Sequence, residues 1–275
     1  MNVYNLGMDD LLVTKEIALK DALRSYGSAA VAFSGGVDST LLLDVAFEVL
    51  SSDAVALTAL MAGLPVRERL AAQDFCARRG IHHLEVDFDE FAVAGFADNP
   101  PNRCYLCKRA LLSTLLSLTA ELGVPRLLDG SNLDDENDYR PGRTALEELG
   151  VASPLKEAGF TKADIRALSQ ERGLPAWDKP ACACLSTRLP VGTHLTPELL
   201  RRIDAAEQAV LEAGAKQARV RVHGELARIE VDAESIPLLM EQETRERLVP
   251  ELQILGFAYI ALDLQGYRTG SMNEK

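Results

Sequence analysis

The feature that most constrains the fold is the stretch VAFSGGVDST at residues 31–40. A short apolar run ends at Ser34, two glycines follow, and a helical pattern begins at about Val37. A buried strand that turns sharply into a helix is typical of a parallel sheet whose strands are joined by helices. Because a helix N-terminus presents unpaired N–H groups and the positive end of its dipole, this turn is suited to an anion.

The same alternation of apolar runs and helical periodicity continues to about residue 180. We predict further strands at 54–60, 82–88 and 126–130, and helices at 9–25, 37–50, 65–79, 104–122 and 161–173. Strands that alternate with helices predict an α/β fold with a doubly wound parallel sheet, covered by helices on both faces.

After Pro190 the pattern becomes that of a smaller α+β domain. Thr196 is a candidate N-cap, with Pro197 in the first turn of a helix. The predicted elements are a helix to about 213, strands at 218–224 and 226–232, a helix at 233–255 and a strand at 259–264. We therefore expect two domains, residues 1–185 and residues 186–275.

Composition limits the partners. The net charge is −12, whereas a broad nucleic-acid surface relies on lysine and arginine, so no nucleic-acid partner is expected. No stretch approaches the roughly 20 apolar residues of a membrane helix. The N-terminus lacks the basic flank and apolar centre of a signal peptide. The expectation is a cytoplasmic protein with no membrane partner.

The glycine turn differs from the common P-loop. That loop requires a lysine after its last glycine, and here Asp38 follows instead. A carboxylate beside phosphates makes chemical sense if it holds Mg²⁺. The plainer interpretation is a tight turn with a capping aspartate, but the whole string SGGVDST is more specific than a pair of glycines.

SGGVDS resembles the PP-loop of the ATP pyrophosphatase superfamily, whose members have an adenine nucleotide alpha hydrolase-like sheet. The resemblance implies cleavage of ATP between its α and β phosphates and adenylation of an acceptor oxygen. It also implies that one set of residues holds the pyrophosphate part of ATP together with Mg²⁺: Ser34, Gly35, Gly36, Asp38, Ser39 and Thr40.

The cysteines fall into groups that indicate a metal or catalysis. Cys104 and Cys107 form C-x-x-C, and Cys182 and Cys184 form C-x-C. Cys76 lies in an apolar helical pattern and is most simply a core residue. In a long cytosolic chain these spacings do not predict a disulfide framework. A Cys₄ zinc site, an iron–sulfur cluster and unliganded thiols all remain open at this point.

Three stretches together resemble one family. They are NPPNRCYLCKR, LLDGSNLDDENDYRPG and WDKPACACLSTRLP. They resemble LarE, the ATP-dependent sulfur transferases of nickel-pincer nucleotide biosynthesis, and the resemblance covers nearly the whole chain. It implies that a carboxylate of pyridinium-3,5-biscarboxylic acid mononucleotide is adenylated, with release of pyrophosphate, and is then converted to a thiocarboxylate.

The resemblance also implies a source of sulfur. Some family members sacrifice a cysteine sulfur, whereas others hold a [4Fe-4S] cluster with three cysteines and carry an extra sulfide on it. The C-x-x-C places this chain with the cluster type, with Cys104, Cys107 and Cys184 as ligands. Cys182 departs from the family pattern and is either a spectator or an alternative ligand. An external sulfide donor is also implied.

An acidic protein needs local cations to hold an anionic mononucleotide. Arg219 and Arg221 alternate on a predicted strand and so share a face. The resemblance implies these substrate contacts: Thr187, Arg188, Glu207, Arg219, Arg221 and Glu230. Asp129 and Arg140 follow the fourth strand at its carboxyl end, which makes them candidate nucleotide contacts, with a polar surface loop as the alternative. The resemblance also implies a homo-oligomer, either a trimer or a hexamer.

Three other functions remain open, and one of them is a synthetase that uses ammonia and holds no iron. A PP-loop tRNA thiolase with three cluster cysteines has similar motifs, and a non-catalytic protein that binds adenine nucleotides needs only the loop. The leading hypothesis carries a geometric expectation. The activated carboxylate and the sulfur should meet in a crevice between the larger and the smaller domain.

Overall fold

The computed structural model describes residues 8–137 and 142–268. The chain divides into two compact units. The first contains the residues up to 61 together with 66–90 and 104–182, and the second contains 62–65, 91–103 and the residues from 183 onward. Over the two described ranges, no helix has both the length and the apolar character needed to cross a membrane.

The first unit is built on a parallel sheet of four strands in the order β3-β2-β1-β4. The strands are β1 (Ala29–Ala32), β2 (Ala54–Leu60), β3 (His82–Asp87) and β4 (Leu127–Leu128). In β1, Ala29 lies opposite Ala54 of β2, and Ala30 lies opposite Leu127 of β4. The strand order reverses beside β1, and the carboxyl ends of β1 and β4 flank the position where such sheets bind ligands.

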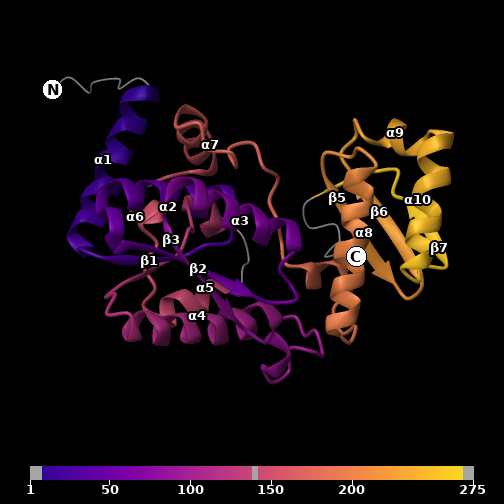
Figure 1. Ribbon diagram of the computed structural model, residues 1–275, viewed down its shortest axis with the longest axis horizontal. Coiled ribbons are helices and arrows are strands. Elements are labelled where there is room, and N and C mark those ends of the chain that lie inside the picture. Colours follow the sequence, from indigo (N-terminus) through magenta and orange to yellow (C-terminus); the bar gives the residue numbers. More distant parts are fainter. Residues whose placement is uncertain (1–7, 138–141, 269–275) are drawn as a thin grey trace. The chain divides into compact units, whose positions relative to one another are not determined.

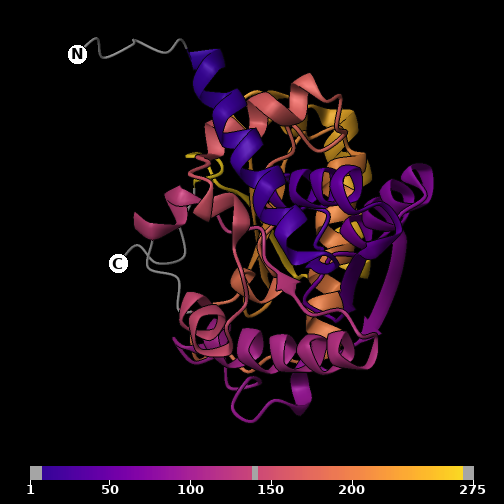
Figure 2. The ribbon, with the colours of Figure 1, turned by 90° about the vertical axis from the view of Figure 1, so that its left-hand side faces the viewer.

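Helices cover both faces of this sheet, as predicted (Figure 1). One face carries α1 (Met8–Tyr26), α2 (Val37–Leu50), α3 (Val66–Arg79), α6 (Pro154–Glu157) and α7 (Lys162–Glu171), and the other carries α4 (Arg103–Glu121) and α5 (Gly142–Leu149). Alternate residues of β1 explain the two layers. Val31 belongs to the core with Leu41 of α2, whereas Ala30 belongs to the core with Leu112 of α4. Figure 2 again shows α1 and α4 on opposite sides.

The helix signals read from the sequence are confirmed at two N-termini. Thr161 and Asp164 form a complete capping box at α7. Thr196 caps α8 (Pro197–Glu212) by accepting a hydrogen bond from Leu199 N. The short helices α5 and α6 were not predicted. Nor were the 3₁₀ turns η1 (Ser51–Asp53), η2 (Glu90–Ala92), η3 (Leu133–Asn137) and η4 (Leu185–Arg188).

The second unit has a mixed sheet of three strands in the order β5-β6-β7. Strands β5 (Ala218–His223) and β6 (Leu226–Val231) are antiparallel, and β7 (Tyr259–Leu262) pairs with β6 in parallel. Helix α8 packs against β5, and α10 (Gln242–Ile254) packs against α8. This is the small α+β domain that the sequence predicts.

One predicted element is wrong. The helical pattern at 233–255 is divided into α9 (Ile236–Met240) and α10. Glu241 separates the two helices with an extended backbone, φ −62° and ψ 142°. Before α9, Asp232 accepts a hydrogen bond from Ser235 N at 3.0 Å, and this turn delays the start of the helix.

Candidate functional site

The turn after β1 has the backbone of an anion-binding loop. Gly35 has φ +71°, in the left-handed region that favours glycine. A Cβ at Gly35 would lie 3.3 Å from the carbonyl oxygen of Glu68 and 3.4 Å from the Cβ of Ala72, so a larger residue would crowd α3. Gly36 is the N-cap of α2 and makes no side-chain cap. Because glycine has no side-chain acceptor for the first N–H groups of α2, these groups suit an anion.

Hydroxyl groups line the same turn. Ser34 Oγ and Ser39 Oγ lie 3.2 Å apart, and Ser39 donates to Gly36 O at 3.2 Å. Ser34 is exposed, whereas Ser39 and Thr40 are buried beneath it. The predicted nucleotide residues thus form one continuous turn, with hydroxyls able to rotate toward phosphate oxygens.

A chain of hydrogen bonds anchors the base of the turn to the sheet. Thr58 donates through Oγ1 to Phe33 O at 2.8 Å, and His83 Nε2 lies 2.8 Å from Thr58 Oγ1. Because the Thr58 proton goes to Phe33, His83 donates through a protonated Nε2. Burial lowers the pKa of His83, which fits a neutral ring. Two neighbouring strands therefore fix the residue that precedes the loop.

Asp38 lies in the first turn of α2 and contacts two side chains from other elements of the first unit. Lys162 Nζ forms an ion pair with Asp38 Oδ2, and Asn132 Nδ2 lies 3.3 Å from Asp38 Oδ1. The side chains of Asp38 and Lys162 are 26% and 34% exposed. A solvent-reachable carboxylate beside a phosphate loop supplies the hard oxygen donors that Mg²⁺ prefers. Asp38 therefore fits its predicted metal role.

The turn after β4 packs directly on this loop. A Cβ at Gly130 would lie only 3.0 Å from Ser39 N, so glycine alone fits without a shift. Asp129 accepts hydrogen bonds from Ser131 N at 2.9 Å and from Lys108 Nζ at 3.2 Å. Asp129 therefore lies next to Gly130, which packs on the loop, and its carboxylate is already paired with Lys108. Arg140, the other predicted nucleotide contact in this segment, lies outside the described residues.

Lys179 reaches the same loop from the segment after α7. Its Nζ lies 3.2 Å from Gly35 O and 2.7 Å from Glu68 Oε2. Lys179 also borders a hollow of about 240 Å³. The other residues of its lining are Phe33, Gly35, Thr40, Ala71, Phe75, Pro175 and Ala176. Aromatic and aliphatic walls next to a phosphate loop suit a purine base.

Sequence reasoning missed three lysines at the loop and at the turn packed on it. Lys108, Lys162 and Lys179 come from α4, from α7 and from the segment after α7, and each pairs with an acidic side chain. In a chain of net charge −12, these lysines place three cationic groups in this region, each balanced by its carboxylate partner. Lys108 follows the C-x-x-C motif and Lys179 precedes the C-x-C motif, so their closeness to these motifs is a sequence signal that identifies both lysines. Lys162 has no such signal.

The cysteines differ in their surroundings. All five are thiols within the described residues. Cys76 is buried, and burial raises its pKa to about 12, so it is the core residue expected from its pattern. Cys104 is exposed and Cys107 half-buried, and they lie three residues apart at the start of α4. Residues at this spacing share one side of a helix, so the pair fits a metal that takes soft sulfur ligands, such as iron or zinc.

Both cysteine pairs lie where the chain passes between the two units. Of the five points at which the chain passes from one unit to the other, one falls between Arg103 and Cys104 and another between Cys182 and Ala183. Within the second unit, Arg103 Nη1 donates to Ser186 O at 3.1 Å. Across residues 8–137 and 142–268, no group of three or more His, Cys, Asp or Glu is arranged as a metal site. The three-cysteine ligand set stays a prediction.

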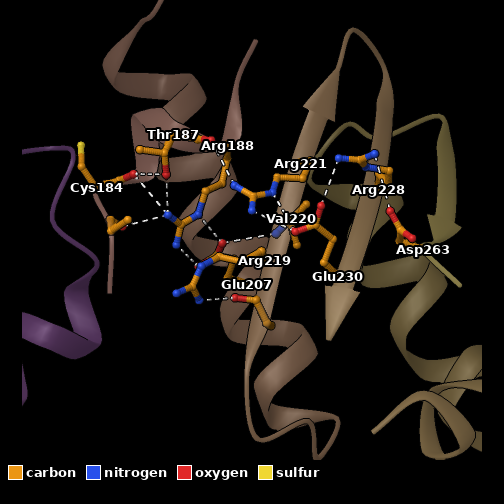
Figure 3. A network of polar contacts seen from close by, with 12 residues as sticks. Cys184, Thr187, Arg188, Glu207, Arg219, Val220, Arg221, Arg228, Glu230 and Asp263 are labelled. Carbon is orange, nitrogen blue, oxygen red and sulfur yellow. Dashed lines mark hydrogen bonds and ion pairs between the residues drawn. The ribbon is translucent and has the colours of Figure 1, made fainter. Parts of the chain in front are cut away.

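The second unit contains a buried network of arginine and glutamate side chains (Figure 3). Arg188 and Glu207 have side chains that are 0% exposed, and they pair through two hydrogen bonds of 2.7 and 3.1 Å. Arg188 Nη1 also donates to Ala183 O at 2.8 Å and to Cys184 O at 3.2 Å. Arg188 therefore holds the backbone at Cys184, whose sulfur points away from the network.

Arg219 and Arg221 lie on β5 and are each 5% exposed. Arg221 pairs with Glu230 at 2.9 Å and donates to Thr187 O at 3.1 Å. The guanidinium of Arg219 lies 5.1 Å from the centre of the Tyr267 ring. The structure thus brings into one region all of the predicted substrate residues, Thr187, Arg188, Glu207, Arg219, Arg221 and Glu230 (Figure 3).

The charges of this region favour an anion. Arg228 adds a fourth guanidinium, 3.0 Å from Glu230 and 3.5 Å from Asp263. The carboxylates of Glu207, Glu230 and Asp263 lie among these guanidinium groups. Arginine binds phosphate and carboxylate through two parallel hydrogen bonds, so the arrangement suits an anionic ligand.

Comparisons with known proteins extend this picture, although no protein-family model matches the chain. An uncharacterized protein of Synechocystis is 43% identical over 96% of this chain and 98% of its own length. The pyridinium-3,5-bisthiocarboxylic acid mononucleotide synthase of Lactiplantibacillus plantarum is 38% identical over 96% of this chain and 95% of its own length. A tRNA-specific 2-thiouridylase of Azorhizobium caulinodans is 29% identical over 54% of this chain and 48% of its own length.

The parallel sheet and the glycine turn with Asp38 define a PP-loop ATP pyrophosphatase, and the partial match to the thiouridylase agrees with this class. The match to the synthase, by contrast, extends along nearly the whole chain. The chain belongs to the LarE family of ATP-dependent sulfur transferases, as its motifs predict.

Proposed function

We propose that this protein adenylates a carboxylate of pyridinium-3,5-biscarboxylic acid mononucleotide and converts it to a thiocarboxylate. The observation that carries the proposal is the 38% identity, over 96% of the chain, to a synthase named for the bisthiocarboxylic product. The glycine turn supports the use of ATP, and the arginine network supports an anionic substrate. The tRNA thiolase alternative is less favoured, because its match covers only 54% of the chain.

ATP binds at the turn of the first unit. The pyrophosphate part of ATP contacts Ser34, Gly35, Gly36, Asp38, Ser39 and Thr40, and the base occupies the hollow beside Phe33. Asp38 holds Mg²⁺, which offsets the charge of the phosphates when bound. Asp129 and Arg140 complete the nucleotide contacts.

The oxygen of a carboxylate is a poor leaving group, and adenylation converts it into a good one because it then leaves as part of AMP. A carboxylate oxygen of the substrate attacks the α-phosphorus and pyrophosphate leaves, which gives an acyl adenylate. Sulfide then attacks the carbonyl carbon and AMP leaves with the oxygen. Lys108 and Lys179 offset the negative charge that develops on phosphate oxygens during the first step, because both cations already lie in this region.

Cys104, Cys107 and Cys184 would hold a [4Fe-4S] cluster, and the bound cluster would supply the sulfide that replaces the carboxylate oxygen. The donor set fits, because two thiols share one turn of α4. Cys182 is the alternative third ligand. A sulfide donor outside this chain replenishes the sulfur.

The network of the second unit binds the substrate phosphate. Arg219, Arg221 and Thr187 contact the anion, while Glu207, Glu230 and the fully buried Arg188 orient them. The protein acts in the cytoplasm on a small molecule, without nucleic acid or membrane, as a trimer or hexamer. We assign ATP binding to the predicted domain of residues 1–185, and substrate binding and oligomerisation to that of residues 186–275, although residues 62–65 and 91–103 belong to the second unit.

The reaction itself tests the function. The protein is incubated without oxygen with ATP, Mg²⁺, sulfide and the biscarboxylic mononucleotide. We expect pyrophosphate, AMP and a product in which sulfur has replaced oxygen, measured by mass spectrometry. Pyrophosphate release that does not depend on the mononucleotide, or thiolation of bulk tRNA instead, would contradict the proposal.

Metal analysis tests the sulfur source. Protein purified without oxygen is expected to be brown, with about four iron and four sulfide per chain. Cys104→Ser, Cys107→Ser and Cys184→Ser should each lose most of this iron, and Cys182→Ser should keep it. A colourless protein with zinc would refute the cluster. If Cys182→Ser loses the iron and Cys184→Ser keeps it, Cys182 is the third ligand and Cys184 is the spectator.

A further inference from the structure

Lys162 is paired with Asp38, the residue proposed to hold Mg²⁺. Its Nζ forms an ion pair with Oδ2, while Asn132 Nδ2 contacts the other carboxylate oxygen at 3.3 Å. Both of these side chains direct hydrogens at the carboxylate of Asp38, which is an arrangement that stabilises its negative charge.

The lysine is positioned from its own backbone. Lys162 is the first residue of α7, and its N–H donates to Asp134 Oδ2 at 2.7 Å. Asp134 N in turn donates to Asn132 Oδ1 at 3.0 Å. The start of α7 and the turn after β4 are thus joined to Asp38 by one set of hydrogen bonds. A lysine held at its backbone, with a flexible side chain that is 34% exposed, can leave one anion for another nearby.

We propose that Lys162 is the resident counter-cation of Asp38 in the protein without nucleotide, and that it yields this carboxylate to the divalent cation that arrives with ATP. The released ammonium then pairs with a phosphate oxygen. This inference rests on the proposed binding of ATP at the turn. Its consequence is that the protein binds the cation weakly until nucleotide is present.

Manganese binding without nucleotide tests the proposal, because free Mn²⁺ is measured directly by electron paramagnetic resonance. Lys162→Met should bind Mn²⁺ about fivefold more tightly than the unmodified protein, which is the size expected from removing one partly exposed ion pair. Lys162→Arg keeps the positive charge and should stay within about twofold of the unmodified protein. Adding Asp38→Asn to Lys162→Met should abolish the gain.

A matched control is an ion pair at the N-terminus of the same helix. Lys15 of α1 forms a 2.7 Å ion pair with Asp164 in the first turn of α7. Lys15→Met therefore removes a similar pair and should leave Mn²⁺ binding unchanged. Equal Mn²⁺ affinity in Lys162→Met and the unmodified protein, both folded by circular dichroism, would overturn the proposal. So would an equal gain in Lys15→Met.

Calorimetry with a non-cleavable α,β-methylene analogue of ATP separates this inference from the proposed function. With Mg²⁺ present, Lys162→Met should bind the analogue several-fold more weakly, since one phosphate contact is lost. Failure of the unmodified protein to bind the analogue would contradict the proposed function. Equal binding of the analogue by the unmodified protein and Lys162→Met would contradict only the role of Lys162 and would leave the proposed function standing.

Discussion

The two charged regions of the molecule are built differently. At the glycine turn of the first unit, Asp38 and its partner Lys162 are about a quarter and a third exposed. In the second unit, Arg188 and Glu207 are fully buried and pair through two hydrogen bonds. The first region therefore exchanges partners readily, and the second keeps a fixed arrangement.

This difference matches what each region is proposed to do. A nucleotide with its metal must enter and leave in every cycle, so partly exposed contacts that water and ions can replace are suitable. A buried arginine that binds the carbonyls of Ala183 and Cys184 instead fixes a backbone. Breaking a buried pair leaves a charge without compensation, which is costly. Substitutions in the two regions should thus have different consequences.

The largest effect is expected at Asp38. Asp38→Asn removes the metal carboxylate, and pyrophosphate release should fall by about 10³-fold while the melting temperature changes little. Asp53→Asn, on the exposed turn η1, is the control and should retain full activity. Loss of stability in Asp38→Asn comparable to the loss at Glu207 would remove the distinction between the two regions.

The opposite behaviour is expected at Glu207. Glu207→Gln leaves the guanidinium of Arg188 buried without its counter-charge and should cost about 3 kcal/mol in urea unfolding. The control is Glu234→Gln, which breaks the ion pair between Glu234 and Lys216. The side chains of these two residues are 76% and 74% exposed. Glu234→Gln should not measurably shift the midpoint of urea unfolding. Similar midpoints for the two variants would contradict the inferred importance of burial.

A smaller effect is expected at the cap of α7. Asp164→Ala removes the capping box and should cost about 1 kcal/mol at neutral pH. Although burial acts against it, hydrogen bonds from Lys15 and Thr161 lower the pKa of Asp164. Its contribution to stability is therefore complete above the usual aspartate pKa and is lost as the pH falls through the lowered value. Unfolding curves of the two proteins should converge in acid, and a constant gap would contradict this.

Much of the fold was predictable from local patterns. Apolar runs that alternate with helical periodicity identified the parallel sheet, and Thr161 and Thr196 identified two helix starts. The division between α9 and α10 was missed, because a glutamate carries no sequence signal of a break and only the structure shows the extended backbone of Glu241.

Local patterns revealed the site residues that are adjacent in sequence, whereas the separated arginine and glutamate residues of the second unit were predicted from the family resemblance. The turn at residues 34–40 and the C-x-x-C were visible because each is continuous. Lys162 was not, because lysines are common on surfaces and its partner Asp38 lies more than a hundred residues away. Asn99 and Arg103 illustrate the same limit, since their contacts with Pro190 and Ser186 form only in the folded second unit.

The most direct test of the account compares pyrophosphate release and thiocarboxylate formation in Cys107→Ala and Asp38→Asn, without oxygen and with the mononucleotide present. The account predicts that Cys107→Ala still releases pyrophosphate but forms no thiocarboxylate, and that Asp38→Asn does neither. Thiocarboxylate formed by Asp38→Asn, or pyrophosphate release lost in a folded Cys107→Ala protein, would contradict the separation of activation from sulfur supply.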